Sequence, residues 1–165
     1  VLFRSRRFIT EDMAEAITQK QLEMTLDVMA NSLVYWVQDL VRGGRLAEKA
    51  HIFAMTSAGS LVAWPHYGAV SAAKAALESY VRQLAVELAP LRVAVNAIRA
   101  GVTDTPALRK IPGHERMIEV AKEHNPYHML TTPEVVGEVI ARLVEQPYWM
   151  TGNVINVDGG ETIAG

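Results

Sequence analysis

The chain has 165 residues, 50% hydrophobic and 21% charged, a balance that suits one globular domain spanning residues 1–165. The formal net charge of -2 argues against a nucleic-acid partner, and the absence of cysteine excludes disulfides and thiolate metal sites. No apolar run reaches the roughly 18 residues of a membrane span, so we expect a cytoplasmic protein with no membrane partner.

The first residues fit neither a natural start nor a signal peptide. The chain begins at Val1, its first methionine is Met13, and no apolar stretch follows the opening residues. Residues 1–5 resemble a translated sequencing-adapter remnant, so we predict that residues 1–7 are a non-native leader. On this interpretation the chain is the carboxyl part of a longer protein, and an in-frame start codon close to Val1 would contradict it.

Apolar periodicity and turn residues predict alternating helices and strands. Residues 11–43 are predicted to form a long helix or a helix pair, because apolar side chains recur at helical steps from Leu22 to Leu40. The elements that follow are a strand at 51–56, an alanine-rich helix from Val70 to Leu88, a strand at 93–98, a helix from Thr132-Pro133 to Pro147, and a strand at 153–157. The small side chains of the alanine-rich helix would let another helix approach closely. Such alternation implies a parallel sheet covered by helices, an α/β fold.

The predicted strands are not followed by a glycine-rich phosphate-binding turn. No Gly-x-Gly-x-x-Gly turn, the signature that cradles a dinucleotide phosphate, follows a predicted strand. Three strands also make a thin sheet. We therefore predict the carboxyl part of a Rossmann-like doubly wound parallel sheet, a truncated three-layer αβα arrangement whose strand at 51–56 lies at an unprotected edge.

Tyr67 and Lys74 lie seven residues apart at the start of the alanine-rich helix. This spacing is close to two helical turns, so both side chains point to nearly the same side. A neighbouring ammonium favours the ionised phenol, which makes such a pair a candidate proton donor tuned by charge. Val70, about one turn after Tyr67, cannot titrate, so the chain offers only the longer pairing here.

Four segments, in this order, resemble the carboxyl part of the short-chain dehydrogenase/reductase family over residues 8–163. They are Thr56–Ser60, the helix with Tyr67 and Lys74, Asn96–Thr105 with Ala100 in place of the family's proline, and Asn153–Gly160. Most members place the tyrosine about one helical turn before the lysine. The longer spacing here is most similar to the bacterial enoyl-acyl-carrier-protein reductases, in particular the enoyl reductase III type.

This resemblance implies catalytic roles for three side chains. Tyr67 would donate a hydrogen bond to the thioester oxygen of the substrate, and Lys74 would hold the ribose hydroxyls of a nicotinamide cofactor. Ser57 would be the third catalytic residue, although a serine at such a turn more often serves as a cap. Likewise, a tyrosine beside a proline often only packs a turn, and a lysine on a helix is often only a solvated charge.

The resemblance also implies a cofactor and a substrate region. Lys74, Gly101, Val102 and Thr105 would contact NADPH or NADH, with NADPH favoured by the resemblance alone, and Thr105 has the alternative role of capping a helix. Within residues 103–127, a substrate lid and an ordinary surface helix pair are equally compatible with the pattern. As a lid, this segment would place Leu108, Ile111 and Met117 along an acyl channel. The irregularly spaced histidines of this segment predict no metal site.

The long helix departs from the family at one position. Most members have an asparagine there that stabilises a water near the lysine, and in this chain the position falls on Met29. Asn31 lies two residues on and could take that place only through a local shift of the helix.

The activity that the resemblance implies is NAD(P)H-dependent reduction of the double bond of an enoyl thioester in fatty-acid synthesis. The substrate would be a thioester of acyl-carrier protein or coenzyme A, and the family's assembly implies a homo-dimer or homo-tetramer. A related reductase acting on a carbonyl or alcohol, such as a 3-oxoacyl thioester, is the first alternative. A catalytically inactive fragment or scaffold is the second, and we expect these 165 residues alone to be inactive because the phosphate-binding turn is missing.

Overall fold

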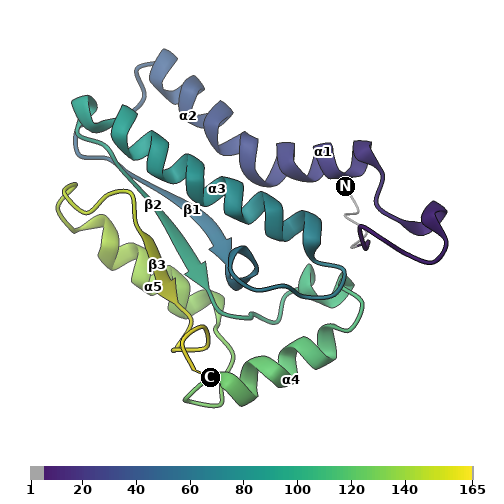
Figure 1. Ribbon diagram of the computed structural model, residues 1–165. Coiled ribbons are helices and arrows are strands. Elements are labelled where there is room, and N and C mark those ends of the chain that lie inside the picture. The colour runs from purple at the N-terminus through teal and green to yellow at the C-terminus, as the bar shows by residue number, and fades with distance from the viewer. Residues whose placement is uncertain (1–5, 165) are drawn as a thin grey trace.

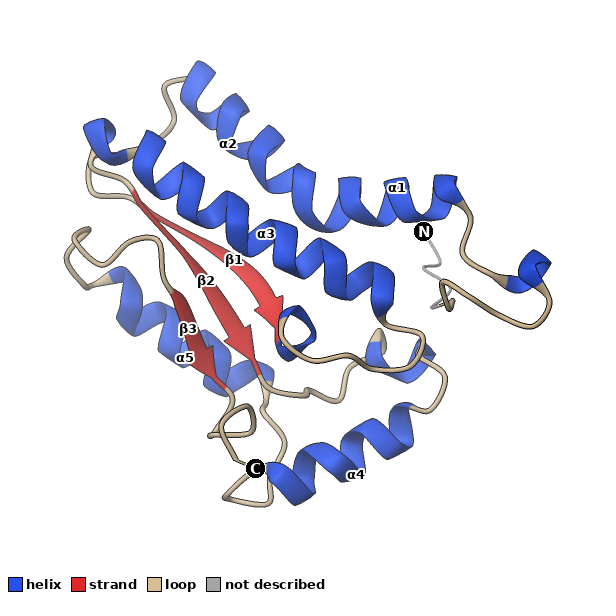
Figure 2. Cartoon of the chain, viewed as in Figure 1, coloured by secondary structure: helices blue, strands red, loops and turns tan. Residues whose placement is uncertain are grey.

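Three parallel strands form the centre of the structure, a computed structural model that describes residues 6–164 (Figure 2). They are β1 (His51–Ser57), β2 (Ala94–Ala100) and β3 (Val154–Val157), in the order β1-β2-β3. Each overlaps its predicted range, and β1 lies at one edge of this sheet, as predicted. The register pairs Ser57 with Ala100 and Ala100 with Val157, so the three strands end side by side. Residues 1–5 of the predicted leader lie outside the described residues.

Helices cover both faces of the sheet. Side chains alternate between the two faces of a strand, and consecutive residues of β2 such as Val95 and Asn96 are fully buried. Figure 1 shows helix α3 (Gly68–Glu87) on one side of the sheet and helix α5 (Pro133–Val144) on the other. The predicted three-layer αβα arrangement of a Rossmann-like α/β fold is confirmed.

The predicted long helix begins later than residue 11. It runs without interruption through α1 (Gln19–Leu26), the π-helical turn η2 (Asp27–Asn31) and α2 (Ser32–Arg42). Thr18 and Gln21 form a capping box, in which each side chain accepts a hydrogen bond from the other residue's backbone N–H. The prediction of helix from residue 11 was therefore wrong, because this cap stops the helix and leaves only the short turn η1 (Met13–Glu15) before it.

Small side chains bring the long helix against α3. Ala30 on η2 and Ala73 on α3 are both fully buried, and α3 contacts both α1 and η2. Leu77 and Val81 extend the same core toward Val95 of the sheet. The close helix approach that the alanine-rich sequence predicted is confirmed.

The remaining elements connect the layers. They are the 3₁₀ turns η3 (Ala58–Ser60), η4 (Ala89–Leu91) and η5 (Leu108–Lys110), and helix α4 (His114–His124). Helix α5 begins as predicted, since the Thr132 hydroxyl accepts a hydrogen bond from the Val135 N–H. None of the helices within residues 6–164 is long and apolar enough to cross a membrane.

Candidate active site

The candidate site lies where the three strands end. Ser57 closes β1, Gly101 follows β2 and Asp158 follows β3, and the parallel register brings these ends to one edge of the sheet. In open α/β sheets, ligands bind at this carboxyl edge. Tyr67 caps the start of α3 close by, so segments far apart in the sequence meet here.

Ser57 and Tyr67 are in direct contact. Their hydroxyl oxygens are 3.4 Å apart, and either can be the donor. The tyrosine ring packs against the backbone of Gly59, where an added Cβ would lie 2.3 Å from Tyr67 Cε1. Gly59 therefore has to lack a side chain for Tyr67 to reach Ser57.

Lys74 takes a partner that its spacing did not indicate. Its ammonium donates a 2.7 Å hydrogen bond to the Met55 carbonyl of β1, and within residues 6–164 no hydrogen bond joins it to Tyr67. Burial lowers the pKa of Lys74, while the nearby Glu78 charge acts in the opposite direction. The structure places Tyr67 and Lys74 on one helix at the same edge of the sheet, and the tuning of one by the other stays a prediction.

The position of the expected asparagine is filled differently. Met29 packs against the hydrophobic core. Asn31 ends the π-helical turn η2, and its Oδ1 accepts a hydrogen bond from the Tyr80 hydroxyl at 3.0 Å. Within the described residues, neither side chain hydrogen-bonds to Lys74.

The segment after β2 is closely packed at its first glycine. An added Cβ at Gly101 would lie 2.4 Å from Thr131 Oγ1 and 2.8 Å from Glu161 Oε2. The next backbone N–H, that of Val102, donates to the Glu161 carboxylate at 3.1 and 3.3 Å. Burial raises the pKa of Glu161, and the hydrogen bond from Val102 opposes that rise.

Thr105 makes a local hydrogen bond near the start of η5, whose N-cap residue is Ala107. Its Oγ1 accepts a hydrogen bond from the Leu108 N–H at 3.1 Å. This bond does not test a cofactor contact, which stays a prediction.

The predicted substrate residues lie on the turn and helix beyond Thr105. Leu108, Ile111 and Met117 are all half-buried. The segment forms η5 and α4, so the predicted range 103–127 contains regular helix. Whether these side chains line an acyl channel stays a prediction.

The sequence reasoning missed a buried charge network beneath Ser57. The Glu78 carboxylate accepts hydrogen bonds from the Thr56 and Ser60 hydroxyls, both at 2.7 Å, and pairs with the Arg99 guanidinium at 3.0 Å. Arg99 also donates to Asn156 Oδ1 at 3.1 Å. The signal was an arginine within the apolar run of a central strand, where a charge is costly unless it is paired.

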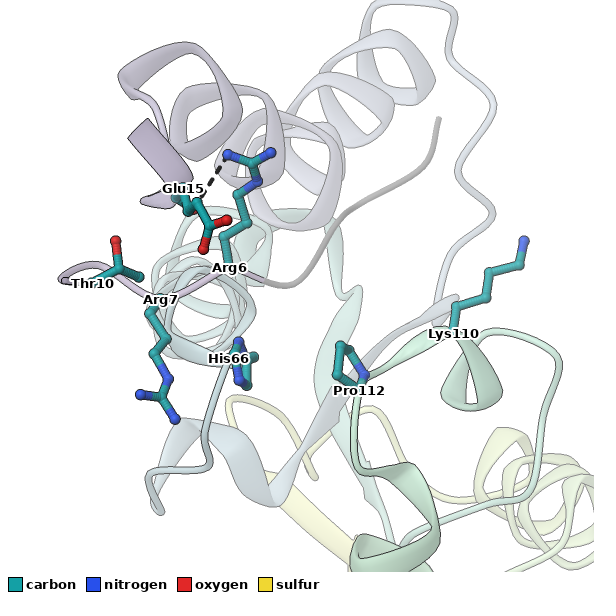
Figure 3. Close-up of a pocket in the computed structure, with 7 residues that line it drawn as sticks. All are labelled: Arg6, Arg7, Thr10, Glu15, His66, Lys110 and Pro112. Carbon is teal, nitrogen blue, oxygen red and sulfur yellow. Dashed lines mark hydrogen bonds between the residues drawn. The ribbon is translucent and has the colours of Figure 1, made fainter. Parts of the chain in front are cut away.

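A groove lies next to the site, lined by Arg6, Arg7, Thr10, Glu15, His66, Lys110 and Pro112 (Figure 3). Arg6 Nη1 donates to the backbone carbonyls of Ala14, Glu15 and Ala16 at the groove's wall. In Figure 3 the Arg7 and Lys110 side chains point away from each other. Because Arg6, Arg7 and Lys110 outnumber Glu15, the groove is basic, but these cations do not converge on one point.

Residues 6–164 contain no group of three or more histidine, aspartate or glutamate side chains that could hold a metal ion. Among the groups at this edge are the hydroxyls of Ser57 and Tyr67 and the ammonium of Lys74, which are hydrogen-bond donors. This combination can bind and stabilise a developing oxyanion.

Comparison with known proteins identifies the family. The family model described as enoyl-(acyl carrier protein) reductase matches residues 4–162. The chain belongs to this family. The match includes both sides of the site, from Ser57 and Tyr67 to Val102 and Glu161.

Relatives in the family are similar to this chain in sequence and in fold. The NADH-dependent enoyl-[acyl-carrier-protein] reductase of Enterococcus faecalis is 32% identical over 87% of this chain and 57% of its own length. The 1-cyclohexenylcarbonyl-CoA reductase of Streptomyces collinus is 35% identical over 68% of this chain and 41% of its own length. The crystal structure of the NADH enoyl-[acyl-carrier-protein] reductase from Aquifex aeolicus superimposes with a TM-score of 0.81 at 32% identity, covering 90% of this chain and 58% of that one. This chain thus spans little more than half the length of the enoyl-[acyl-carrier-protein] reductases that it matches.

Proposed function

We propose that this chain forms the proton-donating side of an NAD(P)H-dependent reductase that acts on the double bond of enoyl thioesters in fatty-acid synthesis. The observation that carries the proposal is the contact of Tyr67 with Ser57 at the carboxyl edge of the sheet, with Lys74 about two turns further along the same helix. The names of the Enterococcus and Streptomyces relatives, one an enoyl-carrier-protein reductase and one a CoA-thioester reductase, support the substrate class.

Tyr67 acts on the substrate oxygen in this proposal. Reduction of an enoyl thioester at its β-carbon builds negative charge on the thioester oxygen, and a preorganised donor there stabilises the transition state. Tyr67 donates that hydrogen bond, and Ser57 holds the phenol's orientation through the contact of their hydroxyls. The reacting carbon lies farther from the oxygen than in carbonyl reduction, which suits the longer spacing between Tyr67 and Lys74.

A nicotinamide cofactor would supply the hydride, and several groups of this chain fit it. The Lys74 ammonium has three N–H donors, of which Met55 takes one, so two remain for ribose hydroxyls. Gly101 and Thr105 follow β2 in the same segment. The Val102 N–H would bind a cofactor amide when its hydrogen bond to Glu161 breaks. The enzymes from Enterococcus and Aquifex are named for NADH, so we propose NADH ahead of the NADPH that the sequence resemblance favoured.

The thioester carrier is proposed to be acyl-carrier protein or coenzyme A, both of which bear phosphate. The basic rim formed by Arg6, Arg7 and Lys110 lies in the groove lined by His66, the residue before Tyr67. Cations at the entrance of a site attract an anionic substrate and raise its association rate. Half-buried Leu108, Ile111 and Met117 would then receive the acyl chain.

Self-association is proposed through the long helix. Large apolar side chains are exposed along the long helix of α1, η2 and α2, among them Met24, Val28, Tyr35 and Trp36, and Trp36 is 72% exposed. Exposed apolar side chains gathered on one element favour a protein–protein contact. Sedimentation of the complete gene product tests this assembly, and a stable monomer would contradict it.

The decisive experiment follows NADH and NADPH oxidation by the complete gene product with two thioesters. Turnover with a crotonyl thioester but not with an acetoacetyl thioester supports enoyl reduction, and the reverse result supports a carbonyl reductase. Absence of both turnover and cofactor binding supports a scaffold. For the enoyl reductase, we expect Tyr67→Phe to lower turnover strongly with little change in cofactor affinity, and unchanged turnover would remove Tyr67 from the mechanism.

A further inference from the structure

The residues on either side of Ser57 are tied to one buried carboxylate. Thr56 precedes Ser57, and Ser60 lies three positions after it. The hydroxyls of Thr56 and Ser60 both donate to Glu78 Oε1 at 2.7 Å, and Ser60 Oγ also lies 3.0 Å from the Ser57 carbonyl. The turn that carries Ser57 is therefore anchored from both ends on a single side chain of α3.

Arg99 provides the opposite charge for this carboxylate. Its Nη2 donates to Glu78 Oε1 and Oε2 at 3.0 and 3.2 Å, and its Nη1 reaches Asn156 on β3. The two side chains of the pair are only 9% and 10% exposed. The pair thus links α3, β2 and β3 directly beneath the ends of the strands.

Burial of the Glu78–Arg99 ion pair has a free-energy cost, because both charges lose their hydration. Apolar residues of similar volume often replace a buried ion pair with no loss of stability. Moreover, the buried Arg99 Nε has no hydrogen-bond partner within residues 6–164, and an unpaired buried donor carries a cost. Apolar side chains in this place could not accept the hydrogen bonds that Thr56 and Ser60 donate.

We propose that Glu78 and Arg99 are positioning residues, which hold the turn at Thr56–Ser60 so that the Ser57 hydroxyl meets the Tyr67 hydroxyl. Gly59 lies within the same turn and packs under the Tyr67 ring, so a displaced turn moves both contacts of the tyrosine. The catalytic meaning of this positioning rests on the proposed function, but the positioning itself does not.

The test compares three variants of the 165-residue chain. Glu78→Leu combined with Arg99→Met removes both charges, and Glu78→Gln keeps an oxygen that accepts from Thr56 and Ser60. Glu48→Gln combined with Arg92→Met removes an exposed ion pair of 2.8 Å and serves as the matched control.

The readouts are amide hydrogen exchange and the ring signals of carbon-13-labelled tyrosine. Leu61 and Val62 report on the turn because their N–H groups donate to the Ala58 carbonyl, and Tyr67 is assigned by comparison with Tyr67→Phe. We expect the double Glu78/Arg99 variant to fold. The amide hydrogens of Leu61 and Val62 should exchange at least about tenfold faster than in the parent, and the Tyr67 ring signals should shift. Glu78→Gln should retain the Tyr67 signals, and the control pair should change neither readout.

Two results would overturn the positioning role. One is a folded double variant with the parent's exchange rates and Tyr67 signals, which would make the pair irrelevant to the turn. The other is a double variant that does not fold, which would make the pair a requirement for stability. In the complete gene product the double variant should lower kcat and leave the KM for the cofactor unchanged. A parent protein without any reductase activity would count against the proposed function alone, since exchange and tyrosine signals do not depend on turnover.

Discussion

The two sides of the candidate site are held in different ways. Between β1 and α3, buried and partly buried hydrogen bonds hold the turn after Ser57. The hydroxyls of Thr56 and Ser60 donate to Glu78, and that of Ser71 donates to the Gly59 carbonyl. Beyond β2, by contrast, ion pairs on the surface dominate residues 103–124. They are Asp104–Arg109, Arg116–Glu119 and Arg116–Glu123, with His114–Glu115 as a further pair when the imidazole is protonated. Ala121 is the one buried residue of α4.

This difference separates two tasks. A segment with few buried contacts opens at low free-energy cost, whereas a buried and hydrogen-bonded turn keeps its geometry. Under the proposed function, the Ser57–Tyr67 side would hold a proton donor in place, and the side with η5 and α4 would adjust to a bound substrate. Substitutions around the Ser57 turn should therefore lower the free energy of unfolding far more than substitutions in residues 103–124.

The largest effect is expected from Arg99→Met. This change leaves the Glu78 carboxylate buried without its cation, and removal of one partner of such a pair costs about 3–5 kcal/mol of unfolding free energy. Urea denaturation of the chain measures the loss. Adding Glu78→Leu should restore most of it, and a double variant as unstable as Arg99→Met would contradict the explanation.

The next effect is expected from Gly59→Ala. Its new Cβ would lie 2.3 Å from Tyr67 Cε1, and overpacking of this kind costs about 1–3 kcal/mol. The matched control is Gly137→Ala within α5, where a Cβ meets no atom within 4 Å and the helix gains up to about 1 kcal/mol. Equal denaturation midpoints for the two variants would show that Tyr67 does not need Gly59.

A smaller effect is expected on acidification. Burial alone would raise the pKa of Glu78, but hydrogen bonds from Thr56, Ser60 and Arg99 outweigh it and hold the pKa below its usual value. Glu78 therefore stabilises the fold above its unfolded pKa of about 4.3 and loses that contribution as the pH falls through the lower folded value. The difference in unfolding free energy between the parent and Glu78→Gln should shrink as the pH drops below about 4.3. A difference that stays constant from neutral to acid pH would rule this out.

The smallest effect is expected from Asp104→Asn. The Arg109 guanidinium binds both oxygens of this carboxylate at 2.8 Å and lowers its pKa. Both side chains are exposed, and exposed pairs contribute little because water and salt screen them. Thermal unfolding should therefore be nearly unchanged, and a loss comparable to that of Gly59→Ala would show that this segment is as firmly held as the Ser57 turn.

Much of the fold could be predicted because its signals are local. The three strands, the start of α5 at Thr132 and the close approach of a helix to the alanine-rich α3 follow from short apolar runs, a capping residue and small side chains. The start of the long helix was missed because the range from residue 11 did not take account of the capping box of Thr18 and Gln21, which sets the first turn of α1.

By itself the sequence determined the order of helices and strands, the family motifs and the spacing of Tyr67 and Lys74, since each depends on residues within a few turns of one another. Only the tertiary structure decided the partners: Lys74 with Met55, Arg99 with Glu78, and Val102 with Glu161. The physical reason is that hydrogen bonds and ion pairs are chosen by the register of packed elements. Spacing along one helix sets the direction of a side chain, and only the sheet and the turns around it decide what that side chain meets.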